Sequence, residues 1–197
     1  MNWIENVLII AGISLDIFAG MECQGSLVAK IDKKQLTLIC VLVAAWQLSA
    51  LAIGTFLSGL LYSNNLAHDE KFVGLVIAAV IFFALGVRLI VKAVKNEWVN
   101  ERLEEKLGMG RFLRMAAVTS IYTLLAGIAF GFLETNLARM LILIVGITVA
   151  VVVMGMYTGY HFGFQHKTKA YVGGALLLWI AGIDVIVRHI MCYTGRV

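Results

Sequence analysis

The chain has 197 residues, of which 61% are hydrophobic and only 14% are charged, and its formal net charge is +4. A soluble domain averages about 25% charged residues, so this composition excludes an ordinary soluble protein. The apolar residues fall into six runs, and each is long enough to cross a bilayer, which takes about 20 residues. We therefore expect one all-α polytopic membrane protein without a soluble second domain.

The predicted spans follow one another with short connections, except for a charged segment after the third span. Residues 95–110 carry charges at helical spacing, and we expect this segment to lie as a short linker at the cytoplasmic interface. The stretch from Met21 to Ser26 is polar, so the first span could be interrupted there. The six spans are predicted at residues 3–28, 36–61, 72–94, 112–133, 138–160 and 170–191.

The distribution of Lys and Arg predicts the orientation in the membrane. Loops one, three and five and their flanks hold eleven of these residues, and the opposite side holds four. Because cytoplasmic loops carry the excess of positive charge, the odd-numbered loops are predicted to be cytoplasmic and both termini to lie outside. The first span has no basic residue before it, so we expect it to be retained and not cleaved as a signal peptide.

The two halves of the chain resemble each other. The tripeptide 14–16 aligns with residues 120–122 at an offset of 106, and Gly25 aligns with Gly131 at the same offset. Since each half has three spans, the second half must be inverted relative to the first, an architecture that recurs in transporters with the substrate near the midplane. We predict two inverted three-helix repeats, 1–94 and 111–197, joined by the linker 95–110.

Glycine is the residue expected to control helix packing, because the chain has 19 glycines and no proline. Gly54 in the second span resembles Gly155 in the fifth. Small residues let helix backbones approach closely in membranes. We therefore expect close helix contacts at Gly54 and Gly59 and at Gly155 and Gly159.

Asp16 is the strongest candidate for a functional residue, since it is a carboxylate in the middle of the first apolar span. An ionised carboxylate at mid-bilayer costs several kcal/mol, and such groups are usually kept for function. The functional interpretation is a ligand for a metal cation or a proton. The alternative is a structural carboxylate that neighbouring hydroxyl groups satisfy.

The residues around Asp16 resemble a known signature. The run Ser14-Leu15-Asp16-Ile17-Phe18-Ala19, with Gly25 nine residues past the aspartate, resembles the first signature of the manganese efflux pump family (MntP-type, within the lysine-exporter superfamily). The resemblance implies six spans in two inverted halves and export of Mn²⁺ across the bacterial cytoplasmic (inner) membrane. It covers essentially the whole chain, through Gln47, Leu85-Gly86, Thr119-Ser120-Ile121 and Gly173-Gly174.

Two positions depart from that family. Tyr122 stands where the second half usually carries its own Asp, and Gln24 stands where the family has Lys. Mn²⁺ prefers hard oxygen ligands, so one carboxylate with neutral oxygens would hold it less strongly than two. Tyr122 could also donate a hydrogen bond to Asp16, which would satisfy the pair without a metal. The polar set expected near the midplane is Asp16, Ser14, Gln47, Ser120, Thr119 and Tyr122, with Asp16 as the metal ligand.

Three further ionisable residues are predicted to line the vestibules: Glu22, Arg88 and Asp184. Glu22 lies about 9 Å along a regular helix from Asp16 and about 120° around it, so the two can share an ion only if the helix breaks. Arg88 and Asp184 occupy equivalent places in the two halves, and Asp184 is alternatively a relocated partner for Asp16. His161 and His166 are expected to be solvated at the cytoplasmic interface.

These observations together predict a secondary transporter that exports a divalent cation, Mn²⁺ first, by alternating access around Asp16, with span one moving against span four. No nucleophilic triad, phosphate-binding loop or dinucleotide motif is present, so neither an enzyme nor a cofactor is expected. The predicted partners are membrane lipid and the cation, not nucleic acid, and no oligomer is predicted. The alternative is a diverged member that serves as a membrane interaction subunit or exports another small solute.

Overall fold

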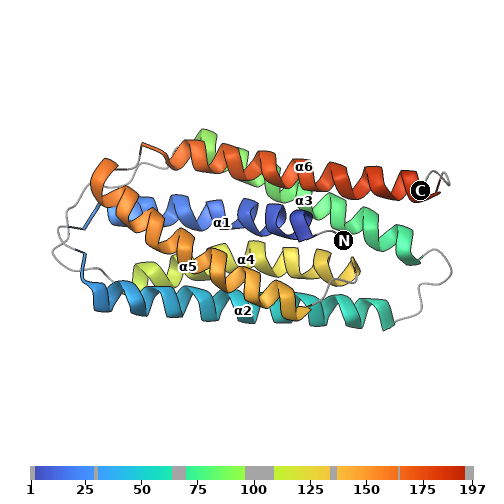
Figure 1. Ribbon diagram of the computed structural model, residues 1–197, viewed down its shortest axis with the longest axis horizontal. Coiled ribbons are helices and arrows are strands. Elements are labelled where there is room, and N and C mark those ends of the chain that lie inside the picture. Colours follow the sequence, from blue (N-terminus) through green and yellow to red (C-terminus); the bar gives the residue numbers. More distant parts are fainter. Residues whose placement is uncertain are drawn as a thin grey trace.

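Long α-helices make up the fold in a computed structural model that describes residues 3–28, 31–63, 70–95, 109–133, 137–163 and 165–193. They lie roughly along one direction (Figure 1), and each connection on one end of the molecule joins an odd-numbered helix to the next even-numbered one. Within the described residues the helices are α1 (Trp3–Gly25), α2 (Lys33–Ser63), α3 (Glu70–Lys95), α4 (Met109–Phe132), α5 (Leu137–Phe162) and α6 (Lys167–Tyr193).

Each of these helices is long and apolar enough to cross a membrane, which confirms the predicted all-α multi-pass membrane protein. The expected interruption of the first span is wrong, because α1 runs as one helix to Gly25. Residues 96–108 of the predicted linker lie outside the described residues. The apolar spans are Asn6–Gly25, Lys33–Leu60, Val76–Lys95, Phe112–Phe132, Ala138–Phe162 and Lys167–Val187.

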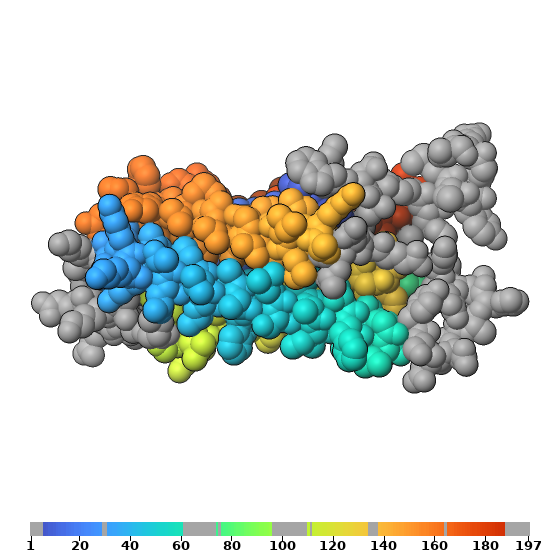
Figure 2. All heavy atoms as spheres, turned by 60° about the horizontal axis from the view of Figure 1, so that its bottom comes forward, coloured from blue at the N-terminus to red at the C-terminus, as the bar shows by residue number. Residues whose placement is uncertain are grey.

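The outer faces of the helices are apolar, as a lipid-facing surface requires. Phe56 on α2 is 69% exposed and Ile142 on α5 is 74% exposed. The two helices contact each other and form one broad face of the molecule (Figure 2). In water so much exposed apolar surface would be unfavourable, at about 25 cal/mol for each Å², whereas in lipid it carries no such cost.

Helix α1 is the most enclosed element, with 61% of its apolar span buried inside the protein. It packs extensively against α5 and α6 and touches α4 only slightly. A polar side chain is costly where a helix faces lipid. The buried side of α1 therefore offers the place where Asp16 can be accommodated, and Asp16 is 2% exposed.

The helix pairs match each other between the two halves. Helix α1 packs on α5 as α4 packs on α2, and α1 packs on α6 as α4 packs on α3. If α1, α2 and α3 are exchanged with α4, α5 and α6, the pair α1–α5 becomes α4–α2 and the pair α1–α6 becomes α4–α3. The inverted repeat stays a prediction, and these pairings are the ones it requires.

Glycines lie at both matched crossings. A Cβ added at Gly54 on α2 would clash with the Leu124 carbonyl oxygen on α4, and one at Gly159 on α5 would clash with the Glu22 carbonyl oxygen on α1. A Cβ at Gly155 would lie 2.9 Å from the Phe18 carbonyl oxygen. The expected close packing is thus confirmed at these glycines. It is wrong for Gly59, which has no described atom within 4 Å of an added Cβ.

Two alanine substitutions on α2 test the glycine crossing. We expect Gly54→Ala to lower the free energy of unfolding by about 1–3 kcal/mol, the usual cost of overpacking. Gly59→Ala is the matched control, and it should be neutral or slightly stabilising, because alanine is about 1 kcal/mol better than glycine in a helix. Thermal unfolding of the detergent-solubilised chain measures both, and equal melting temperatures would contradict the assignment.

Candidate functional site

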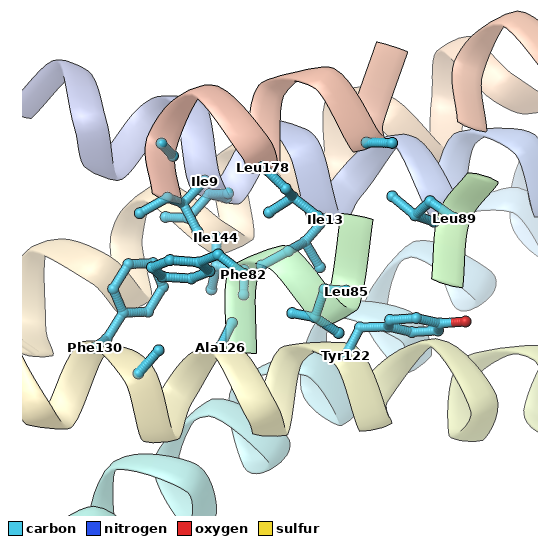
Figure 3. Packing of buried hydrophobic residues seen from close by; sticks show 14 of the residues in the cluster. Ile9, Ile13, Phe82, Leu85, Leu89, Tyr122, Ala126, Phe130, Ile144 and Leu178 are labelled. Carbon is cyan, nitrogen blue, oxygen red and sulfur yellow. The ribbon is translucent and has the colours of Figure 1, made fainter. Parts of the chain in front are cut away.

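The polar site begins where the apolar core ends, at Tyr122 on α4. The core between α1, α3, α4 and α6 includes Phe82 and Phe130, whose ring centroids are 6.1 Å apart. Tyr122 lies at one edge of this cluster, and its hydroxyl points away from the aliphatic side chains (Figure 3). The hydroxyl is buried and has no hydrogen-bond partner among the described residues. An unpaired buried polar group costs about 1–3 kcal/mol, and the Lys92 ammonium lies close enough to Tyr122 to interact with it.

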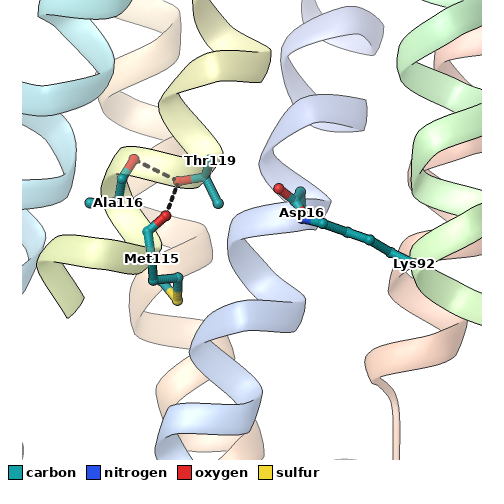
Figure 4. Close-up of polar contacts among 5 residues, drawn as sticks. All are labelled: Asp16, Lys92, Met115, Ala116 and Thr119. Atoms are coloured by element: carbon teal, nitrogen blue, oxygen red, sulfur yellow. Dashed lines mark hydrogen bonds and ion pairs between the residues drawn. The ribbon is translucent and has the colours of Figure 1, made fainter. Parts of the chain in front are cut away.

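Asp16 forms an ion pair with a residue of another helix (Figure 4). The Lys92 Nζ on α3 donates to Asp16 Oδ1 at 2.7 Å. The aspartate is 2% exposed, whereas the lysine side chain is 29% exposed. Asp16 Oδ2 is also buried, and no described residue donates to it. The carboxylate therefore keeps one oxygen free for another donor or a cation.

Two cationic side chains lie against the ring of Tyr122. The Arg88 Cζ is 4.8 Å from the ring centroid and the Lys92 Nζ is 4.7 Å from it. Lys92 Nζ also lies 5.7 Å from the ring centroid of Tyr171 on α6. Cations within about 6 Å of an aromatic centroid are attracted by the ring. We call Asp16, Arg88, Lys92, Tyr122 and Tyr171 the central site. With Asp16, Arg88 and Lys92 ionised and both tyrosines neutral, this site carries a net charge of +1.

The sequence of α3 explains why both cations reach the same place. Arg88 and Lys92 are four residues apart, so they lie on one face of the helix, one turn above the other. Leu85 and Leu89 next to that face are 2% and 1% exposed and fix the helix against the core. The long side chain of Lys92 extends from near the end of α3 and places its ammonium group at Asp16 in the middle of α1.

Other predicted site residues hydrogen-bond between α2 and α4. The Trp46 Nε1 donates to Ser120 Oγ at 2.8 Å. The Thr123 hydroxyl donates to Gln47 Oε1, and Gln47 Nε2 has no partner among the described residues. These bonds hold α2 to α4, and none of them reaches Asp16. The role of Gln47 and Ser120 as ligands stays a prediction.

Thr119 and Ser14 are buried but are not joined to Asp16 by a hydrogen bond in the described structure. The Thr119 hydroxyl donates to the carbonyl oxygens of Met115 and Ala116 in its own helix, at 3.0 and 3.1 Å (Figure 4). Ser14 is 2% exposed and lies two residues before Asp16 on α1. A ligand would have to draw the Thr119 hydroxyl away from these carbonyl oxygens. The assignment of Thr119 and Ser14 as ligands also stays a prediction.

The residues predicted for the vestibules lie in three different places. Arg88 belongs to the central site, and Asp184 is half-buried on α6. Glu22 is fully buried, and its Oε1 accepts the backbone N–H of His166 at 2.8 Å. The His166 side chain is 43% exposed, in line with the expected interface position, but its Nδ1 is buried 3.6 Å from Glu22 Oε1, a contact that the sequence did not predict. His161 is exposed, as expected.

Lys92 is the main residue that sequence reasoning missed. The predicted topology counts Lys92 among the basic residues of loop three and its flanks. In the structure Lys92 lies within α3, which continues to Lys95. Its spacing is the available signal, since it follows Arg88 by four residues and Leu85 by seven and so shares their face. The described ranges contain no group of three or more His, Cys, Asp or Glu side chains that could hold a metal ion.

Comparison with known proteins gives the family. A profile of the family described as "Putative manganese efflux pump" matches residues 30–186. The chain belongs to this family. The match begins after the first signature, whereas full-length relatives align over most of the chain.

Three relatives named "Putative manganese efflux pump MntP" or "MntP 2" illustrate the similarity. The protein of Campylobacter jejuni (strain RM1221) is 26% identical over 96% of this chain and 98% of its own length. That of Mannheimia succiniciproducens is 25% identical over 90% of this chain and 92% of its own length. The Clostridium botulinum (strain Hall) protein is 25% identical over 96% of both chains. No solved structure matches this chain.

Removing Lys92 tests the ion pair. Lys92→Met leaves Asp16 buried without its cation, and loss of one partner of a buried pair costs about 3–5 kcal/mol of stability. Lys95→Met, three residues further along and exposed, is the control and should change stability by less than about 0.5 kcal/mol.

The double variant Asp16→Asn/Lys92→Met should recover most of the lost stability, because it removes both charges. Thermal unfolding in detergent measures this double-mutant cycle. Equal unfolding temperatures for Lys92→Met and Lys95→Met would show that the ion pair does not hold the helices.

Proposed function

We propose that the chain exports a divalent metal cation, Mn²⁺ first, by secondary transport around Asp16. The observation that carries the proposal is a carboxylate in the middle of a membrane span that is 2% exposed and has one oxygen unused. Such groups are expensive in lipid and mark ion pathways. Membership of the manganese efflux pump family supports the same substrate class. We place the protein in the bacterial cytoplasmic membrane with both termini outside.

In this proposal Lys92 is the cation that Asp16 holds when no metal is bound. An arriving ion displaces Lys92 Nζ from Asp16 Oδ1 and uses Oδ2, the Tyr122 hydroxyl and water as further oxygen ligands, which suit Mn²⁺. The partly exposed lysine can move aside on its flexible stem. When the metal leaves, Lys92 returns and neutralises the carboxylate. The resident cation thus keeps the empty site from carrying an uncompensated charge.

Helix packing supports a direction for the alternating-access movement. Helix α1 is held mainly by α5 and α6, and its contact with α4 is slight. A movement of α1 against α4 would therefore break few contacts between these two helices themselves. Asp16 lies on α1 and Tyr122 on α4, and Lys92 contacts both, so the same movement would change the central site.

The charge balance favours a second candidate function. Arg88 and Lys92 outnumber Asp16 in the central site, and Arg side chains bind carboxylates and phosphates through paired hydrogen bonds. A small solute with an anionic group would neutralise the excess charge without displacing Lys92. The chain would then be an exporter of such a solute, and the two candidates respond in opposite ways to the changes below.

Neutralising Asp16 tests the metal-export proposal. We expect Asp16→Asn to abolish manganese tolerance and raise cellular Mn²⁺ in a manganese-sensitive host, because the variant lacks the only carboxylate in the central site. Asp32→Asn is the control, since Asp32 is an exposed carboxylate before α2. Metal content of cells grown in Mn²⁺ is the measurement. Unchanged tolerance in Asp16→Asn at equal membrane abundance would exclude Mn²⁺ export through this site.

Changing Tyr122 distinguishes the two candidates. Tyr122→Asp places a second carboxylate beside Arg88 and Lys92, so we expect tighter Mn²⁺ binding than in the wild type, whereas Tyr122→Asn controls for loss of the ring. Mn²⁺ binding to the purified variants measures the effect. An exporter of anionic solutes would instead lose transport in Tyr122→Asp, because the added carboxylate removes the excess positive charge. Weaker Mn²⁺ binding in Tyr122→Asp than in Tyr122→Asn would contradict the metal candidate.

A further inference from the structure

We propose that Glu22 and His166 form a second binding site, for a divalent transition-metal cation that includes Mn²⁺, at the end of the molecule that carries loops one, three and five. Glu22 lies in the last turn of α1, and His166 is the residue that precedes α6. The two are 144 residues apart in the sequence and meet through a backbone hydrogen bond of 2.8 Å. This site is separate from the central site, and only its role in export depends on the proposed function.

Two unused polar atoms face this junction. Glu22 is 0% exposed, and its Oε2 is buried without a hydrogen-bond partner among the described residues. The His166 Nδ1 is likewise buried and unpartnered, at 3.6 Å from Glu22 Oε1. That distance is longer than an N–H···O hydrogen bond, which spans about 2.7–3.2 Å. The buried carboxylate and the buried Nδ1 of an imidazole that is otherwise 43% exposed thus face each other without a hydrogen bond between them.

The spacing of these atoms suits two ligands of one metal ion. Carboxylate oxygens and imidazole nitrogens lie about 2.0–2.2 Å from a bound divalent ion, so two ligands at ordinary bond angles are about 3.0–3.5 Å apart. The observed 3.6 Å needs a shift of only a few tenths of an ångström. Since the described residues offer no third His, Cys, Asp or Glu ligand here, water completes the coordination. The imidazole suits Zn²⁺ and Fe²⁺, and the carboxylate with water suits Mn²⁺.

The surroundings predict weak binding and a fixed carboxylate. Lys167 is 8% exposed and near enough to Glu22 to act on its charge, so it opposes a cation at this place. Gly159 on α5 packs directly against the backbone of Glu22 and holds that turn of α1 in position. A transport pathway needs sites that an ion can leave. Glu22 is six residues from Asp16, about 9 Å along the helix, so an ion released here would reach the central site next.

Mn²⁺ binding to the full chain in detergent, followed by electron paramagnetic resonance, tests the site. All variants carry Asp16→Asn, which removes the carboxylate of the central site. We expect one bound Mn²⁺ with a nitrogen coupling from the imidazole. Adding Glu22→Gln or His166→Gln should weaken binding by about tenfold or more, since even partners of metal ligands are worth about 10–100-fold. His166→Gln should also erase the nitrogen coupling.

The controls separate a lost ligand from a lost fold. Glu22→Gln keeps a side-chain oxygen that can accept the His166 N–H, so the junction should stay folded. His161→Gln changes an exposed histidine at the other side of the same loop and should leave the affinity within about twofold.

Mn²⁺ affinity that is unchanged by Glu22→Gln or by His166→Gln, or no bound Mn²⁺ in the Asp16→Asn chain, would overturn this site and leave export around Asp16 untouched. A bound, nitrogen-coupled Mn²⁺ in a chain whose wild type does not lower cellular manganese would support the site and contradict export.

Discussion

The ion pair between Asp16 and Lys92 is the interaction on which the rest of the structure depends. A lone carboxylate in the middle of a bilayer would cost several kcal/mol, and Asp16 is enclosed because α1 is surrounded by other helices. The main contacts of α1 are with α5 and α6, whereas those of α3 are with α6 and α4. The pair is therefore made by the reach of one long side chain and not by close packing of α1 on α3. A contact of that kind can be broken and remade without unfolding the bundle.

Close packing elsewhere allows this central contact to be loose. Glycines bring α2 against α4 and α1 against α5 until the backbones touch, as at Gly54 and Gly159. In membranes such contacts replace the hydrophobic effect as the force that holds helices together. A third such contact joins α1 to α6, where a Cβ at Gly174 would lie 2.8 Å from the Gly12 carbonyl oxygen. By comparison α1 makes few contacts with α4. The tightly packed parts of the fold are thus placed by glycine.

The sequence predicts the spans well, because apolar length alone determines which segments cross a bilayer. It predicts Asp16 for a related reason, since a single carboxylate in such a segment needs an explanation. The partner of Asp16 was not predictable in the same way. Periodicity places Lys92 on a face of α3, but it does not say which helix that face meets or how far a four-carbon stem extends. The contact between His166 and Glu22 was not predicted, because a loop, and not a helix, brings His166 to Glu22.

The two carboxylates of α1 are compensated by different means, which bears on how an ion would move. Asp16 is paired with a cation that cannot leave its helix, whereas Glu22 is held by a neutral backbone N–H. A divalent ion at Glu22 would meet a carboxylate without a paired cation, with Lys167 nearby, whereas at Asp16 it would meet Lys92 bound to the carboxylate. The ion can occupy Asp16 only if Lys92 withdraws toward its exposed side, because two cations on one buried carboxylate repel strongly at low dielectric. The movement of Lys92 is then the step that decides whether an ion passes the middle of the membrane.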